Sequence, residues 1–328
     1  MAGHMRLDRY ARQMAVPGFG GETQDRLHAA RVTVIGAGGL AAPVLQYLVG
    51  AGVGHIRLVD PETIDLSNLH RQTLFRESDT GAPKAEVAAR HLARLNSDTS
   101  IEPCIERFDP ANAERLCSGA DLVLDCADSF AASYIASDHC LGTGKFLVSA
   151  SVVGTAGYCG GYCGDAPGLR AVFPDLPDRL GSCASDGVLG PSVGVIGALQ
   201  AQMALALLTD ARPSPAGKLV TYDATTLRFG EFRFDGVENP APAPRFIATR
   251  EIRTNDLVID LRGPDEPGAT VPGAGRFDLK DIRENGLDPG NVERVVFVCR
   301  SGLRAWKGAE LLSNNWSGDI ALLAIGDA

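Results

Sequence analysis

The 328-residue chain lacks several features that mark common protein classes. It has no cluster of basic residues, and its net charge of −9 repels the phosphates of nucleic acids, so we expect no nucleic-acid binding. No signal peptide follows the first five residues, which read like an expression-tag remnant. The eight cysteines stand singly or in loose pairs, which indicates reduced thiols in the cytoplasm rather than a disulfide framework.

Long apolar runs are also scarce. The uncharged run Val188–Leu208 is long enough to cross a bilayer, but it contains Pro191, three glycines and two glutamines and has no basic flanks. We therefore expect a buried core helix preceded by a loop, and no membrane association. The chain also shows no internal repeat.

The patterns that are present alternate between strand and helix. A strand, a glycine turn and a helix are expected in 31–53, and a second helix in 83–96. Further strands are expected in 55–60, 121–128 and 145–152. Such alternation predicts a Rossmann-like α/β fold, with a mainly parallel sheet and helices on both faces.

A change of composition near Asp235–Arg245 predicts a domain boundary. This stretch is rich in proline and has no periodicity, which is typical of a stiff linker. A second strand–helix series follows, long enough for a small domain. We predict a tag remnant at 1–5, a large α/β domain at 6–236, a linker at 237–246 and a small α/β domain at 247–328.

The glycine turn Gly36–Ala41, "GAGGLA", follows a strand and opens a helix. Small residues let the backbone approach phosphates, and a helix N-terminus offers free N–H groups. Asp60, 24 residues after Gly36, suits a carboxylate that bonds ribose hydroxyls. A nucleotide site is expected here, although the turn alone fits NAD and ATP equally well and could also be a tight turn without a ligand.

Residues after the turn favour a triphosphate over a dinucleotide. "SNLHRQTLF" carries Asn68, Arg71 and Gln72, "GAPKAE" carries Lys84, and "DCADSF" carries Asp128 at a strand end. Cations can spread charge over transferring phosphates, and a carboxylate can hold Mg²⁺. This set disfavours a nicotinamide dehydrogenase, although each residue taken singly could be a solvated surface group.

These motifs come in one order together with "RYARQ" at Arg9–Gln13 and "GVLGPSVGVIGALQA". From Leu7 to Arg233 the chain resembles the ThiF/MoeB/HesA group, bacterial relatives of ubiquitin-activating enzymes. The resemblance implies a homodimer that uses ATP and Mg²⁺ to adenylate the C-terminal glycine of a small ubiquitin-like sulfur carrier ending in Gly-Gly.

The resemblance also implies a role for each matching residue. Arg12 would reach into the partner's active site, Asp128 would bind Mg²⁺, and Cys183 could bond covalently to the carrier or to sulfur. The nucleotide would be held by Asp60 at the ribose and, at the phosphates, by Gly36, Gly38, Gly39, Asn68, Arg71, Gln72 and Lys84.

The chain departs from the family pattern at the structural zinc site. Two CxxC pairs are usual in relatives, but Gly168 and Ala171 occupy the first pair's positions, and Ala241–Pro244 replaces the second. A tetrahedral site needs four ligands, so we expect no zinc. Cys159 and Cys163 are four residues apart on one extended segment and should share a sheet face. We interpret them as structural thiols, with a metal or redox role as the alternative.

The last 80 or so residues resemble a rhodanese-like domain through "LVIDLRGPDE", "ATVPGAGRFDL" and "VVFVCRSGLRAW". Cys299 follows a strand and opens a loop toward a helix N-terminus, with Arg300 and Arg304 nearby. We expect these groups to lower the thiol pKa and to stabilise a persulfide. Thr270 stands where histidine is frequent, and the chain stops short of the usual closing glycines.

The combined hypothesis is a fused enzyme. The first domain makes an acyl-adenylate on the carrier, and Cys299 then delivers sulfur from a persulfide or thiosulfate donor, with Cys183 taking part. Two alternatives stay open. The tail could be inactive, leaving adenylation alone, or the protein could be a scaffold that binds a nucleotide and a ubiquitin-like partner.

Overall fold

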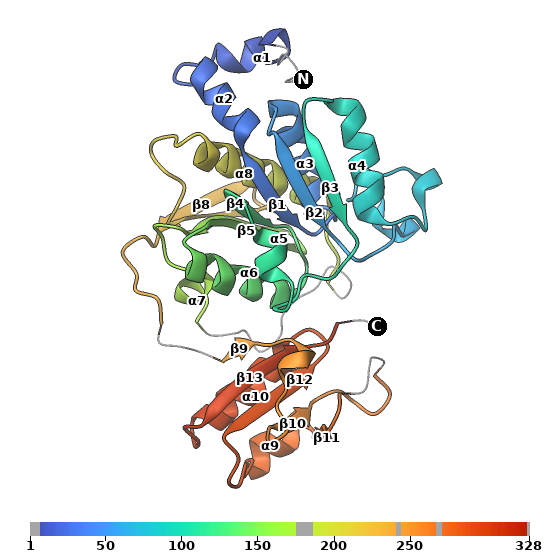
Figure 1. Ribbon diagram of the computed structural model, residues 1–328, viewed down its shortest axis with the longest axis vertical. Helices are drawn as coiled ribbons and strands as arrows, with labels where there is room; N and C mark the ends of the chain where they lie inside the picture. The colour runs from blue at the N-terminus through green and yellow to red at the C-terminus, as the bar shows by residue number, and fades with distance from the viewer. Residues whose placement is uncertain (1–6, 175–185, 241–243, 267–270, 327–328) are drawn as a thin grey trace.

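The computed structural model describes residues 7–174, 186–240, 244–266 and 271–326. Two sheets organise them, each with its own helices (Figure 1). The larger unit occupies the upper part of the view, and the smaller unit, formed after the proline-rich stretch, lies beneath it.

The large sheet has eight strands in the order β3-β2-β1-β4-β5-β6-β7-β8. The first five are mutually parallel and the last three are antiparallel. Their bounds are β1 Arg31–Ile35, β2 His55–Val59, β3 Ser100–Cys104, β4 Leu122–Asp125, β5 Phe146–Val153, β6 Ala156–Cys163, β7 Lys218–Asp223 and β8 Arg228–Arg233. The strand order reverses between β1 and β4, which makes the carboxyl ends of these two strands the usual place for a ligand in such a sheet.

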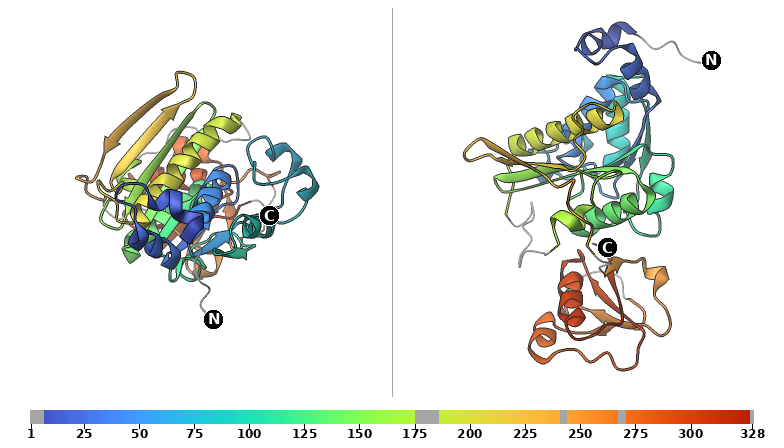
Figure 2. Two further views of the ribbon diagram at one scale, coloured as in Figure 1. Left: turned by 90° about the horizontal axis from the view of Figure 1, so that it is seen from above. Right: turned by 90° about the vertical axis from the view of Figure 1, so that its left-hand side faces the viewer.

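Helices cover both faces of this sheet (Figure 2). One face carries α3 (Ala41–Ala51), α4 (Lys84–Leu95) and α8 (Gly190–Leu208), and the other carries α5 (Ala113–Cys117), α6 (Phe130–Thr143) and α7 (Leu169–Val172). Because both faces are covered, central strands are mostly apolar: β4 has the sequence LVLD, and all four of its residues are buried. The short helices α1 (Leu7–Met14) and α2 (Gly21–Ala29) lie at the far end from the small unit. Short 3-10 turns stand at η1 (Leu66–Asn68) and η2 (Glu77–Asp79).

The apolar run of the sequence forms α8. In the part of the chain that the structure describes, α8 is the single helix long and apolar enough to suit a bilayer crossing. It packs on β5 and β6, however, and its fully buried Gln200 donates hydrogen bonds to the carbonyls of Asp125 (2.7 Å) and Val148 (3.1 Å). A glutamine bonded to the sheet is typical of a core helix, as expected from the sequence.

The small sheet has five parallel strands in the order β11-β10-β12-β13-β9. Arg245 and Phe246, which the sequence places in the linker, form its edge strand β9 and pair with β13. The other elements are η3 Thr249–Glu251, β10 Leu257–Asp260, β11 Gly275–Arg276, α9 Leu279–Asn285, β12 Arg294–Cys299, α10 Leu303–Ser313 and β13 Asp319–Ala324.

The two units share one apolar cluster. Phe130 and Tyr134 of α6 pack against Trp306 of α10, with ring centroids 5.6 and 5.0 Å apart. Phe246 of β9 joins them, 6.1 Å from Phe130. Burial of aromatic surface stabilises such contacts strongly, so the small unit is docked on α6 rather than merely tethered.

Candidate functional site at the carboxyl edge of the sheet

The glycine turn lies where the strand order reverses. Gly36 has φ +92°, and a Cβ there would lie 2.8 Å from the carbonyl oxygen of Cys126. Only glycine adopts that conformation without strain and tolerates so close an approach. The turn therefore lies directly against the loop that follows β4, and α3 begins after it.

Asp60, the residue after β2, holds the turn in place. Its carboxylate accepts hydrogen bonds from the backbone N–H of Ala37 (2.7 Å) and of Glu62 (2.8 Å). Burial raises the pKa of Asp60, and these hydrogen bonds and Lys84 oppose the rise. The carboxylate thus has a structural role already, and its contact with a ribose stays a prediction.

The segment with Asn68, Arg71 and Gln72 packs over the glycine turn. A Cβ at Gly39 would lie 3.2 Å from the carbonyl oxygen of Arg71, and one at Gly38 would lie 3.7 Å from Gln72 Nε2. Arg71 donates a hydrogen bond to Asn68 Oδ1 (2.5 Å). The buried Gln72 Oε1 has no hydrogen-bond partner among the described residues. An unpaired amide beside a turn of small residues can supply a donor or an acceptor to a bound polar group.

Lys84 begins α4 and is buried. It forms an ion pair with Glu62 (2.5 Å), whose side chain is 61% exposed. Its charge also opposes the rise in the Asp60 pKa. To contact a phosphate, Lys84 would exchange Glu62 for the new anion, which an exposed partner allows.

Asp125 ends β4 and Asp128 lies on the loop after it, but the two carboxylates have different surroundings. Asp128 is exposed on the loop before α6, whose N-cap Ser129 accepts a hydrogen bond from the N–H of Ala132. Asp125 is fully buried and accepts hydrogen bonds from Ser149 Oγ (2.7 Å) and the N–H of Ala127 (3.2 Å). Burial raises the Asp125 pKa to about 6. Sequence reasoning missed Asp125, although an acid inside the buried run "DLVLD" is a recognisable signal.

No group of three or more His, Cys, Asp or Glu side chains within the described ranges could hold a metal ion. Asp128 therefore belongs to no cluster of three such side chains there. That donor set fits Mg²⁺, which commonly takes one or two carboxylates and fills its other positions with water and substrate phosphates. Asp128 as its ligand stays a prediction.

Cys159 and Cys163 do not share a sheet face, contrary to expectation. Cys159 lies in the cluster under α8, 3.6 Å from Met203 Sδ, whereas Cys163 lies in the cluster under α6, near Ser137. The reason is the φ of +59° at Cys163, which breaks the alternation at the strand end. Burial raises both thiol pKa values, that of Cys163 to about 12, which disfavours a redox or metal role. The absence of zinc stays a prediction.

Cys299 ends β12, and the loop after it wraps around the thiol. Its Sγ accepts hydrogen bonds from the N–H of Gly302 (3.1 Å) and of Ala305 (3.4 Å). The expected lowering of its pKa is wrong for this arrangement. Burial raises the pKa more than the N–H groups and Arg304 lower it. Arg304 also pairs with Glu266, so part of its charge is already balanced.

The remaining predicted residues lie elsewhere. Arg12 is exposed on α1, which packs at the amino ends of the strands, where Tyr10 lies against Gly52 just before β2. It cannot approach the glycine turn of its own chain from there. Cys183 and Thr270 are outside the described residues.

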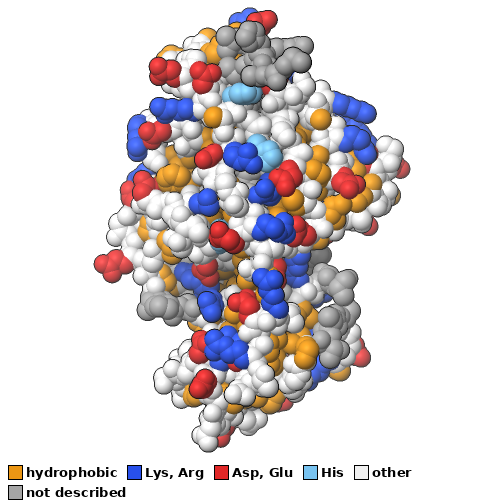
Figure 3. Space-filling view, in the orientation of Figure 1, with side chains coloured by type: hydrophobic (Ala, Val, Ile, Leu, Met, Phe, Trp, Pro, Cys, Tyr) orange, Lys and Arg blue, Asp and Glu red, His pale blue; other side chains and the backbone are white. Residues whose placement is uncertain are grey.

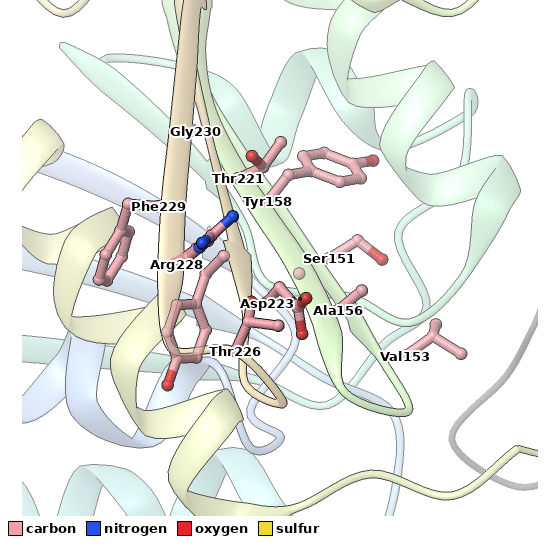
Figure 4. A pocket seen from close by; sticks show the side chains of 12 residues that line it. Ser151, Val153, Ala156, Tyr158, Thr221, Asp223, Thr226, Arg228, Phe229 and Gly230 are labelled. Atoms are coloured by element: carbon pink, nitrogen blue, oxygen red, sulfur yellow. Dashed lines mark hydrogen bonds between the residues drawn. The ribbon is translucent and has the colours of Figure 1, made fainter.

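A hollow of about 650 Å³ lies away from these residues, over β5 to β8 (Figure 4). It is lined by Ser151, Tyr158, Thr221 and Phe229, among others, and Asp223 at its edge is bonded to Thr226. The lining has neither paired carboxylates nor a phosphate-binding turn. We therefore assign the chemistry to the glycine turn and not to the hollow.

Comparison with known proteins agrees with this assignment. Residues 10–241 match the ThiF family. The SAMP-activating enzyme E1 of Haloferax volcanii is 40% identical over 225 residues, which cover 68% of this chain and 83% of that protein. The adenylyltransferase and sulfurtransferase uba4 of Pyricularia oryzae is 40% identical over 300 residues, 86% of this chain, so this chain spans 57% of that relative's length.

Solved structures show the same fold. Escherichia coli MccB crystallised with ATP has a TM-score of 0.62 at 23% identity, covering 70% of this chain and 72% of its own. The family match extends over most of the chain and includes every element of the glycine turn, the Asn68–Gln72 segment and the Asp128 loop. On this evidence, the chain belongs to the ThiF family.

Proposed function

We propose that this protein adenylates the C-terminal glycine of a small ubiquitin-like sulfur carrier ending in Gly-Gly, with ATP as the nucleotide. The main observation behind the proposal is that the predicted site residues come from segments that lie at one place in the fold. The glycine turn, Arg71, Lys84 and Asp128 all belong to segments at the carboxyl edge of one sheet, around the point where the strand order reverses. The names of the relatives support the same activity.

In this mechanism the triphosphate lies against the turn and the N-terminus of α3, where free N–H groups point outward. Arg71 and Lys84 neutralise phosphate charge, and Asp128 would hold Mg²⁺, which would screen the phosphates further. The carrier carboxylate attacks the α-phosphorus and pyrophosphate leaves, so no general base is required. The products are an acyl-adenylate and pyrophosphate.

The second proposed step is sulfur transfer by the small unit, which we interpret as a rhodanese-like domain. The Cys299 thiolate attacks the outer sulfur of a persulfide or thiosulfate donor, breaks its sulfur–sulfur bond to release a thiol or sulfite, and becomes a persulfide. Its terminal sulfur attacks the acyl-adenylate and displaces AMP, which leaves an acyl disulfide on Cys299. A second thiol must then attack the Cys299 sulfur to release the thiocarboxylate. Cys183 is the candidate within the chain, and an external thiol would reduce the resulting disulfide.

The assembly proposed for this reaction is a homodimer. Arg12 lies at the amino edge of its own sheet, so it could serve a glycine turn only in a second chain. A cytoplasmic location suits the proposal as well, because a reducing compartment keeps Cys299 available as a thiol.

The alternative with an inactive tail has one observation in its favour. Cys299 is fully buried and its pKa is raised, which slows reaction with a donor. Two measurements distinguish the proposed two-step enzyme from the inactive-tail and scaffold alternatives. Carrier-dependent ATP–pyrophosphate exchange tests adenylation, and its absence would also favour the scaffold alternative. Mass spectrometry of the carrier after incubation with ATP, Mg²⁺ and thiosulfate tests thiocarboxylate formation.

A further inference from the structure

The carboxyl edges of the two sheets face one another. Gly302, in the loop that encloses the Cys299 thiol, packs against Ala131 in the first turn of α6, where a Cβ at Gly302 would lie 3.3 Å from that of Ala131. Gly326, just after β13, packs against the guanidinium of Arg107, which follows β3. Arg250 of the small unit donates a hydrogen bond to the carbonyl of Ala111 (3.0 Å). Figure 3 shows charged side chains of both signs over this junction.

This contact brings the thiol loop close to the proposed adenylation site. Ala131 is three residues beyond Asp128, so even a fully extended backbone would separate their Cα atoms by no more than about 11 Å. The thiol accepts a hydrogen bond from Gly302, the residue that touches Ala131. The orientation of the small unit on α6 therefore decides whether the Cys299 loop faces Asp128.

Arg170 of α7 connects the three parts that meet at this junction. It forms a two-pronged ion pair with Asp138 of α6, with nitrogen–oxygen distances of 2.9 and 2.8 Å. Its guanidinium lies over the Trp306 ring of α10 at 4.5 Å and near Tyr134 at 5.2 Å. It also donates to the carbonyl of Pro244 at the end of the linker (3.3 Å). One side chain thus contacts the large unit, the linker and the small unit.

The geometry is specific for arginine. The guanidinium is planar, so it can pair with a carboxylate along one edge while its face covers an indole ring. The side chain is 12% exposed, and Nη1 is buried with no hydrogen-bond partner among the described residues, as a nitrogen held against rings would be. Lysine could keep the charge beside Asp138 but could not reproduce the stacked, two-pronged contact.

We propose that Arg170 is a positioning residue for sulfur transfer: it fixes the small unit on α6 so that the Cys299 loop faces the adenylation site. This inference rests on the proposed function. Arg170 does not touch the reacting atoms, and it acts through Trp306 and the linker.

The test uses the full-length chain with Trp316 replaced by phenylalanine, which leaves Trp306 as the single tryptophan. Arg170→Ala should raise acrylamide quenching of Trp306 severalfold, because Trp306 is only 5% exposed when docked. Pyrophosphate exchange, with a ubiquitin-like protein ending in Gly-Gly that supports exchange by the wild type, should stay near the wild-type rate. Persulfide loading of Cys299 from thiosulfate should not fall. Thiocarboxylate formation from preloaded enzyme should slow about tenfold or more, as expected for a misplaced reactant.

Three further variants sharpen the result. Arg170→Lys should give intermediate transfer rates, and Trp306→Leu should reproduce the transfer defect from the other side if the alanine variant fails to fold. Arg212→Ala, which removes a 70% exposed arginine paired with Asp210, is the matched control and should change nothing.

Unchanged quenching in Arg170→Ala would overturn the proposed clamp, and increased quenching with a wild-type transfer rate would overturn its positioning role. If the wild type itself forms no thiocarboxylate while exchange is normal, the proposed sulfur transfer fails and the positioning role falls with it. In that case the quenching result still decides whether Arg170 holds the small unit in place.

Discussion

Three carboxylates at the carboxyl edge of the large sheet have different surroundings. Asp60 is bonded to the glycine turn, Asp125 is enclosed beneath the loop after β4, and Asp128 is exposed on that same loop. Since solvent contact and available lone pairs decide what a carboxylate can bind, Asp128 is the one suited to a cation. Asp125 instead accepts a hydrogen bond from the N–H of Ala127 in the loop that presents Asp128.

Asp125 should make stability depend on pH. Its pKa in the folded protein is raised to about 6, so the folded state holds the proton more tightly than the unfolded state. This contribution is fully present below about pH 4 and is lost as the pH rises to about 6, a window that corresponds to about 3 kcal/mol. Asp125→Asn should therefore gain up to about 3 kcal/mol relative to the wild type between pH 4 and 7, measured by urea unfolding. In Ser149→Ala the Asp125 carboxylate loses a hydrogen-bond donor, so its pKa should rise further. The pH range over which the protonated form stabilises the fold should then extend to higher pH. A flat difference for Asp125→Asn would show that the carboxylate is not protonated in the fold.

Cys299→Ser should abolish thiocarboxylate formation and leave carrier-dependent pyrophosphate exchange nearly intact. Serine is similar in size and can accept the same loop hydrogen bonds, but it cannot form a persulfide. The two rates should be measured side by side, with Cys104→Ser as the control, since Cys104 ends β3 of the large unit. Thiocarboxylate formation by Cys299→Ser at the wild-type rate would transfer the sulfur role to Cys183.

Among the elements, α6 has two functions that the sequence does not connect. Its first turn follows Asp128 and meets Gly302 of the thiol loop, and its outer side holds Phe130 and Tyr134 against Trp306. The glycine turn similarly joins two elements, because Gly36 contacts the backbone after β4 while opening α3. Both bring together the ends of strands that are far apart in the sequence.

Gly36→Ala should destabilise the protein by about 2–4 kcal/mol, because φ is positive and the new methyl group would meet the Cys126 carbonyl. Gly50→Ala is the matched control in the same turn–helix unit. Nothing lies within 4 Å of a Cβ at Gly50 in α3, so alanine there should stabilise the helix by about 0.5–1 kcal/mol. Urea unfolding of both variants checks the pair, and equal effects would show that the turn tolerates a side chain.

At the scale of the whole molecule, the position of Arg12 matters most. It lies at the amino edge of the large sheet, while the glycine turn lies at the carboxyl edge, against which the Cys299 loop packs through Ala131. In a single chain, the guanidinium of Arg12 therefore lies at the opposite edge of the sheet from the glycine turn. In a dimer, Arg12 of a second chain could reach that turn.

Arg12→Ala and Asp128→Ala should each lose pyrophosphate exchange. Mixing the two inactive proteins should restore part of the activity, up to about a quarter of the wild-type rate if subunits exchange at random, because mixed dimers contain one intact site. Subunit exchange should be verified separately with labelled chains. Verified exchange without recovered activity would contradict the shared site.

Local patterns were enough to predict the alternating α/β order, the glycine turn and the core helix α8, because periodicity and glycine chemistry act over a few residues. They could not reveal that the φ of Cys163 turns its thiol to the other face, that burial outweighs the loop N–H groups at Cys299, or that Glu62 pairs with Lys84. The sequence likewise separated the two units by a linker, whereas the fold packs them edge to edge through Arg170 and Trp306. Burial and long-range contacts arise only when distant segments meet, so the tertiary structure alone decided the surroundings of each site residue and the facing of the two edges.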